Sequence, residues 1–103
     1  MTEPVRIRAT AADGATQVRL MAAHPMENGR RRLPDGTLVA AHYITDLTVL
    51  HNTRVVLQAR FGPSVSRDPY LVFSFDGGAP GDTVSVSWRD NRGDERSDSV
   101  TVR

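Results

Sequence analysis

The sequence predicts an all-β protein, an immunoglobulin-like antiparallel β-sandwich of about seven strands. Apolar and polar residues alternate along seven separate segments, which is the pattern of a strand with one buried face. Turn signals such as Asp13-Gly14 separate the segments, and seven short strands in a chain of 103 residues fit such a sandwich in size. The best helical stretch, within Leu38 to Ile44, is weakened by its β-branched and aromatic residues.

The first two expected strands cover residues 5–10 and 17–22, joined by the Asp13-Gly14 turn signal. Their apolar positions recur at every second residue, so each strand buries one face. The residues on these buried faces are Val5, Ile7 and Ala9, followed by Val18, Leu20 and Ala22.

The next two strands, residues 42–51 and 54–61, are expected to form a hairpin across Asn52-Thr53. Both carry apolar residues on two faces, which suggests that a partner covers the outer face. By strict alternation, Tyr43, Leu47 and Val49 share one face of the first strand, and Ile44 and Leu50 lie on the other. In the second strand, Val56 points away from Val55, Leu57 and Ala59.

The last three strands are expected at residues 70–75, 84–89 and 97–102, with a turn at Asn91-Arg92-Gly93 before the last one. Leu71, Phe73 and Phe75 share one face of the first of these strands, and Val84, Val86 and Trp88 share one face of the second. The only tryptophan, Trp88, is therefore expected in the core. The glycine-rich stretch 77–81 precedes a strand, so it predicts a turn rather than a phosphate-binding loop.

The composition of the chain excludes several classes of function. The length fits one domain covering residues 1–103, and 13 basic residues against 12 acidic ones give a net charge of +1. We therefore expect no attraction to nucleic acid or to a membrane surface, and no apolar run reaches the roughly 18 residues of a membrane helix. The absence of cysteine excludes disulfides, thiolate metal sites and a cysteine nucleophile. The residues after Met1 lack the basic and apolar regions of an export signal.

Two connections carry the candidate chemistry. The first, His24 to Ala41, is longer than most loops of compact domains, and such loops are often functional. The second, Gly62 to Pro69, is expected to be short and stiff because it contains two prolines. The run Arg30-Arg31-Arg32 is a weak signal for phosphate and favours a solvated or protein-contacting loop.

Other chemistries have little support in the sequence. His24, Met26 and His42 could supply a soft copper site, but their spacing matches no known ligand pattern. Local hydrogen bonding of the two histidines is the favoured alternative. A small hydrolase is a further possibility, although no serine lies in a Gly-x-Ser-x-Gly elbow.

The two loops carry a resemblance to a known family. The stretch His24-Pro25-Met26-Glu27-Asn28-Gly29, followed by Arg30-Arg31-Arg32, resembles the HPMETG-x-R signature of SoxZ. The stretch from Gly62 to Tyr70 is similar to the family's GPxVSxNPY loop. The similarity continues through residues 35–44, 81–84 and 88–93, and so spans nearly the whole chain. Asn28 and Asp68 are mild departures, since threonine and asparagine are common there.

The resemblance implies a function that the residues alone do not. SoxZ chains are immunoglobulin-like subunits without cysteine that pair with SoxY, whose C-terminal cysteine carries sulfur intermediates during thiosulfate oxidation. The resemblance therefore implies a non-enzymatic carrier subunit that stabilises SoxY, helps to dock other Sox enzymes and needs no cofactor or metal. It also implies a periplasmic location reached by export together with SoxY. A stand-alone immunoglobulin-like periplasmic binding module, for a ligand or copper, is the alternative.

We expect the two signature loops to contact the partner, because binding usually lies in loops displayed on a rigid scaffold. A stable heterodimer with SoxY is expected, and a weaker homodimer when SoxY is absent. The residues expected at the contact are His24, Pro25, Met26, Glu27, Gly29, Arg30, Gly62, Pro63, Val65, Ser66, Pro69 and Tyr70.

Overall fold

The computed structural model describes residues 2–103 and contains seven strands in two antiparallel sheets. The strands are β1 (Arg6–Ala12), β2 (Ala15–Met21), β3 (Ile44–His51), β4 (Arg54–Arg60), β5 (Tyr70–Asp76), β6 (Thr83–Asp90) and β7 (Glu95–Thr101). The predicted immunoglobulin-like sandwich is thereby confirmed, and each strand lies within two residues of its expected bounds. No helix in the described part of the chain is long and apolar enough to cross a membrane.

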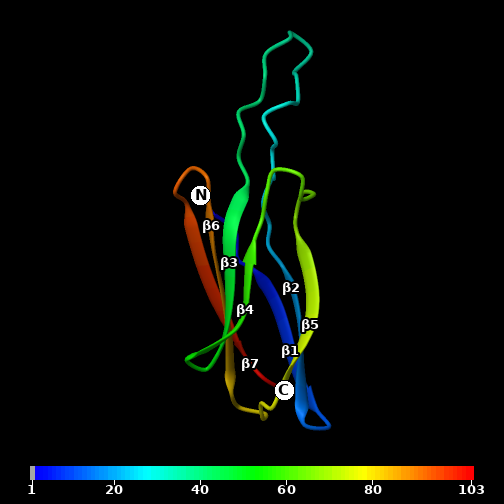
Figure 1. The fold of residues 1–103 in the computed structure, drawn as a ribbon, viewed down its shortest axis with the longest axis vertical. Coiled ribbons are helices and arrows are strands. Elements are labelled where there is room, and N and C mark those ends of the chain that lie inside the picture. Colours follow the sequence, from blue (N-terminus) through cyan, green and yellow to red (C-terminus); the bar gives the residue numbers. More distant parts are fainter. Residues whose placement is uncertain (1) are drawn as a thin grey trace.

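The chain crosses repeatedly between the two sheets, whose strand orders are β1-β2-β5 and β4-β3-β6-β7 (Figure 1). The two long sides of the sandwich differ. On one side the C-terminus closes the gap, because Arg103 exchanges backbone hydrogen bonds with Ala9 and Ala11 of β1. On the other side β4 and β5 are both edge strands, and each pairs with a neighbour on one side only. The sandwich is therefore open between β4 and β5.

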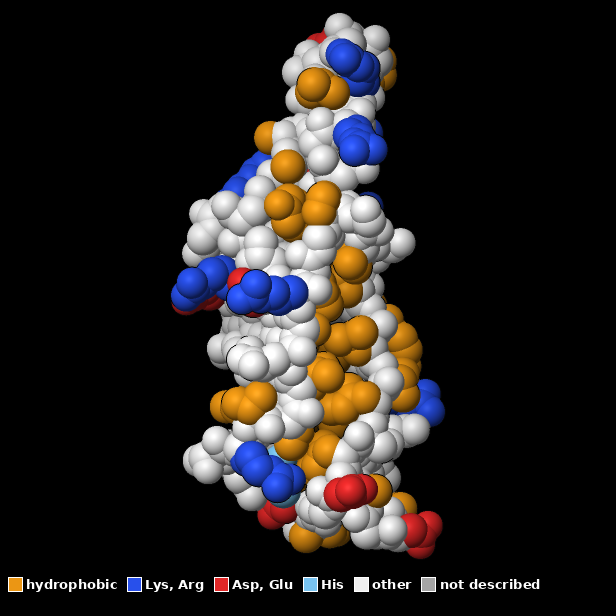
Figure 2. Space-filling view, viewed as in Figure 1, with side chains coloured by type: hydrophobic (Ala, Val, Ile, Leu, Met, Phe, Trp, Pro, Cys, Tyr) orange, Lys and Arg blue, Asp and Glu red, His pale blue; other side chains and the backbone are white. Residues whose placement is uncertain are grey.

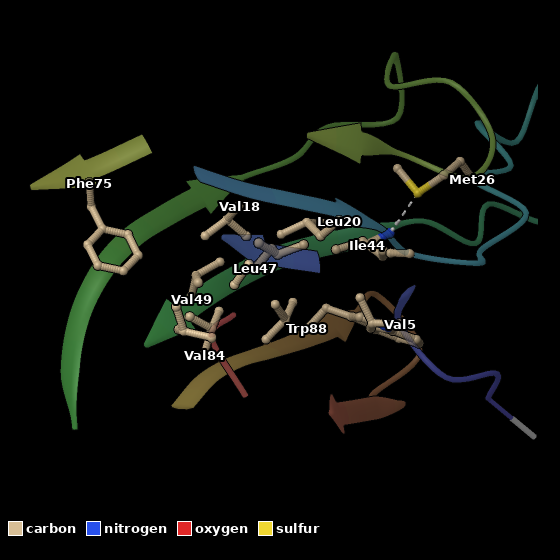
Figure 3. Packing of buried hydrophobic residues seen from close by; sticks show 14 residues of the cluster. Val5, Val18, Leu20, Met26, Ile44, Leu47, Val49, Phe75, Val84 and Trp88 are labelled. Carbon is tan, nitrogen blue, oxygen red and sulfur yellow. Dashed lines mark hydrogen bonds between the residues drawn. The ribbon is translucent and has the colours of Figure 1, made fainter. Parts of the chain in front are cut away.

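The core lies between the sheets (Figure 3). In β2 and β6 it is built from the alternating positions that the sequence predicted. Val18 and Leu20 of β2 face Val84, Val86 and Trp88 of β6, and all five are at most 4% exposed. Burying side chains of this size is the main favourable contribution to folding, at roughly 1.5–3 kcal/mol each. The sequence pattern therefore predicted these core positions correctly.

The expected faces of β3 and β4 were wrong. Ile44, Leu47 and Val49 are all fully buried, because a register shift between Ile44 and Asp46 turns Ile44 toward the core. A second irregularity pairs Leu50 with Val55 and Val49 with Leu57, which leaves Val56 without a cross-strand partner. β-Bulges of this kind reverse the alternation of side chains.

The bulge also exchanges the expected roles of Val55 and Val56. Val56 packs against the core, and Val55 is 50% exposed. The apolar outer face that strict alternation predicted for this hairpin is therefore not formed as expected, and its evidence for a partner is lost.

Residues 24–42 form an arm that projects beyond the sandwich and gives the molecule a long dimension of 54 Å (Figure 1). Backbone hydrogen bonds join its two strands of chain at Glu27 and His42, at Arg31 and Val39, and at Leu33 and Thr37. The long loop predicted from the sequence is thus an extended double-stranded arm. Its two ends, at His24 and His42, lie at the edge of the core.

Candidate functional site at the base of the arm

Three side chains meet where the arm joins the sandwich, and we call them the His–Asp cluster: His24, His42 and Asp90. His24 follows β2, His42 precedes β3, and Asp90 is the last residue of β6. The aspartate lies 66 residues from one histidine and 48 from the other along the chain. His24 and Asp90 are 4% and 3% exposed, so the cluster is an extension of the core.

Asp90 is the centre of this cluster and accepts four hydrogen bonds. Its Oδ2 atom accepts from Nε2 of His24 at 3.1 Å and from Nε2 of His42 at 2.8 Å. Its Oδ1 atom accepts from the backbone N–H groups of Arg92 at 2.9 Å and Asp94 at 3.0 Å. Burial alone would raise the pKa of Asp90, but these hydrogen bonds outweigh it and hold the pKa below its ordinary value. The carboxylate is therefore charged and fully partnered.

The protonation of His24 follows from its two neighbours. Its Nδ1 atom accepts the backbone N–H of Met26 at 3.1 Å, so the proton of the neutral ring is on Nε2, which donates to Asp90. Burial lowers the pKa of His24 and outweighs the opposing effect of Asp90. The ring also stands edge-on to Trp88, with centroids 5.1 Å apart and planes at 89°. His24 is thus neutral and fixed in one orientation.

The ligand atoms of the His–Asp cluster all lie within 4.8 Å of one another, close enough to surround a metal ion. A metal on Nε2 of His24 would have to replace the proton on that atom. The proton could not move to Nδ1, because Nδ1 already faces the N–H of Met26. The Met26 sulfur, the other soft ligand considered for copper, accepts the N–H of Ile44 at 3.2 Å (Figure 3). The chemistry of the donors therefore fits a hydrogen-bonded support better than a metal site.

The second loop, residues 62–69, is tied to the same point. Asp68 accepts the backbone N–H of His24 through Oδ1 at 2.9 Å, and its own N–H donates to the His24 carbonyl at 3.0 Å. The N–H of Ala22 donates to the carbonyl of Pro69. The two loops that were predicted separately from the sequence are therefore one structural unit. A cleft of about 560 Å³ runs beside it, lined by His24, His42 and Arg67 among others.

The twelve residues expected at the partner contact differ in exposure. His24, Met26 and Pro69 are buried, and Glu27, Gly29, Gly62 and Val65 are half-buried. Pro25, Arg30, Pro63, Ser66 and Tyr70 are exposed. The buried ones shape the loops instead of offering surface, and partner contact by the exposed ones stays a prediction.

Gly29 and Glu27 also have structural roles in the arm. Gly29 has a φ of +82°, and a Cβ there would lie 3.3 Å from that of Ala41, so the position suits glycine. Glu27 binds Arg31, with Oε1 and Nη2 2.7 Å apart. Gly29 therefore lets the two sides of the arm approach closely, and the Glu27–Arg31 pair ties residues within one side.

The sequence reasoning missed Asp68 and Asp90 as parts of the site. Asp90 stands out in the sequence only as part of the stretch 88–93 that resembles the family, and no local signal links it to a histidine 66 residues away. The favoured local hydrogen bonding of the histidines was correct for Nδ1 of His24, which binds Met26, but wrong for both Nε2 atoms. The only usable signal was Asp90 itself, a charged residue that continues the alternation of β6 into the core.

The buried, neutral His24 leads us to expect that stability falls on acidification. The unfolded chain takes up a proton at position 24 near the ordinary pKa of 6.5, and the folded chain does so only at lower pH. The contribution of His24 to stability is therefore complete above pH 6.5 and lost as the pH falls through its folded pKa. Asp90 acts in the same direction, but only below its ordinary value of 3.8.

Urea unfolding at about pH 7.5 and about pH 5 measures this loss. The variant His24→Gln should be less stable at the higher pH and should lose less on acidification, because position 24 no longer titrates. The same loss in the variant and the natural chain would exclude His24 as its source. His51, which pairs with Asp82, provides the matched control variant His51→Gln.

Comparison with known proteins supplies the identity. A family model described as "Sulphur oxidation protein SoxZ" matches residues 5–101 of the 103. No curated protein matches the chain. The matched range contains all seven strands, both loops and the whole His–Asp cluster. The chain belongs to the SoxZ family of sulfur oxidation proteins.

Proposed function

We propose that this chain is the non-catalytic subunit of a SoxYZ sulfur carrier and that it forms a heterodimer with SoxY in the periplasm. The family match over residues 5–101 carries the proposal. Carrying sulfur covalently needs a thiol, and this chain has no cysteine. The sulfur atoms would therefore be bound to the partner, and this chain would stabilise and present it.

The apolar surface on the open side of the sandwich supports the proposal of a stable complex with a partner. Between β4 and β5 lies a stripe of apolar side chains that no third strand within residues 2–103 covers (Figure 2). Half-buried apolar residues along these two strands and just after β4 include Leu57, Ala59, Phe61, Leu71 and Phe73. Because apolar surface rimmed by edge strands favours association, we assign the SoxY interface to this side.

The geometry at the base of the arm supports a role for this chain in presenting the two signature loops to other proteins. The His–Asp cluster and Asp68 hold both signature loops against the core, so their exposed residues are displayed on a rigid support. Arg30 lies on the arm, and Ser66 and Tyr70 lie on and after the second loop. We assign contacts with other Sox enzymes to these residues. Because the loops are already rigid, they lose less conformational entropy when a partner docks.

Co-expression with SoxY tests the proposal. We expect the two chains to elute together as a complex that light scattering resolves as a heterodimer or a multiple of it. After incubation with thiosulfate and the other Sox enzymes, intact mass spectrometry should find added sulfur on SoxY and an unchanged mass for this chain. A homodimer is expected only when SoxY is left out.

Two results would overturn it. One is a chain that stays monomeric and fails to bind SoxY at tens of micromolar. The other is a stable sulfur adduct on this chain. Stoichiometric binding of copper by such a monomer would instead favour the stand-alone binding module.

A further inference from the structure

The outer face of the sheet β1-β2-β5 concentrates positive charge. The register places Arg8 of β1 directly opposite Arg19 of β2, and Arg6 lies two residues along the same face. All three side chains are exposed. The chain as a whole has a net charge of only +1, so this face is much more positive than the rest of the molecule.

These arginines have no acidic partner of their own. Within residues 2–103 none of the three takes part in an ion pair, and the one side-chain hydrogen bond runs from Arg19 Nε to Gln17 Oε1 at 3.3 Å. The acidic residue that β5 contributes to this face, Asp76, lies at the far end of the strand. In the other sheet, by contrast, Arg89 pairs with Glu95.

The opposed pair Arg8 and Arg19 costs the isolated chain stability, because like charges directly across a strand pair repel each other. A carboxylate placed between them would turn that repulsion into attraction. Two arginines side by side also offer planar, bidentate hydrogen bonding to carboxylates.

Apolar groups complete the face on its β5 side. Tyr70 and Val72 are 57% and 48% exposed, and in the register they lie opposite Met21 and Arg19. A shallow cleft of about 390 Å³ is lined by Arg6, Arg8, Arg19, Met21 and Tyr70 among others. Tyrosine, arginine and methionine are the residues that protein interfaces favour.

We infer that this basic face, formed by Arg6, Arg8, Arg19, Met21, Tyr70 and Val72, docks an acidic protein surface that sets carboxylates beside an apolar side chain. The charge complementarity selects the acidic occupant, and the apolar half selects protein over nucleic acid, which would need a longer row of phosphate contacts. The inference goes beyond the pairing with SoxY, since these residues lie on the outer face of the sheet β1-β2-β5, which points away from the core. It needs no SoxY to be tested.

The test uses the isotope-labelled chain and a synthetic peptide in which glutamate alternates with leucine. Amide shifts in the NMR spectrum should be confined to β1, β2 and β5 and should weaken with salt. The variant Arg19→Glu should bind the peptide about tenfold or more weakly. It should melt no lower than the natural chain, because the change replaces a repulsive pair with an attractive one. If the variant is folded, its weaker peptide binding is not caused by unfolding.

The matched control is Arg54→Glu, which changes an exposed arginine on the other sheet and should leave peptide affinity unchanged. Three results would overturn the inference. The amide shifts could be absent or spread over both sheets, or the two variants could lose peptide affinity equally. A single-stranded oligonucleotide could also bind the same face as tightly as the peptide does. Each is read from the chain alone, so it is independent of whether SoxY binds.

Discussion

Replacing Asp90 with alanine should lower the free energy of unfolding by about 3–5 kcal/mol, because it removes one partner of a buried charged network. The variant would leave the Nε2–H groups of His24 and His42 and two backbone N–H groups without their acceptor. Each buried donor left unpaired costs about 1–3 kcal/mol. A loss of this size is a large fraction of the roughly 5–15 kcal/mol that stabilises a typical domain.

Urea unfolding followed by Trp88 fluorescence measures this effect, since the ring lies against His24. Asp76→Ala, at an exposed strand position, is the control and should change stability by less than about 0.5 kcal/mol. Hydrogen exchange adds a local readout, because residues 24–42 should exchange faster in Asp90→Ala than in the control. A loss below about 1 kcal/mol would show that the cluster does not hold the arm.

Placing a glutamate at Ala59 should weaken the heterodimer with SoxY about 100-fold, since the interface would then bury an unpaired charge. Ala59 is half-buried on the core-facing side of β4, at the open side of the sandwich, opposite Leu47 in the register. In the isolated chain a longer side chain can reach past the edge strand into water, so folding should suffer less than association.

Gln58→Glu is the matched control, because Gln58 is the adjacent residue on the exposed face of the same strand. Affinity is measured by titration of purified SoxY, and the melting temperature of each variant is measured separately. Equal affinity of the natural chain and Ala59→Glu would move the interface away from the open side. Whether the chain pairs with SoxY at all is decided separately, by co-elution of the two chains.

The sequence by itself determined the fold class, the strands and most of the core. The period of two in β2 and β6 is a local property of the chain, so Val18, Leu20, Val84, Val86 and Trp88 could be assigned to the core without knowing what they pack against. The two signature loops were equally visible, because their residues are contiguous. The lack of a thiol was plain as well, and it bounds the chemistry of the chain.

Only the tertiary structure decided the faces of β3 and β4 and the nature of the site. A bulge inserts one residue into a pair of strands, and its place depends on the partner strand, so Val55 and Val56 exchanged their expected exposure. The site depends on Asp90 meeting His24 across 66 residues of chain. Such contacts form because a buried polar group needs hydrogen-bond partners, which the packed fold supplies from distant parts of the chain, and no local pattern in the sequence records them.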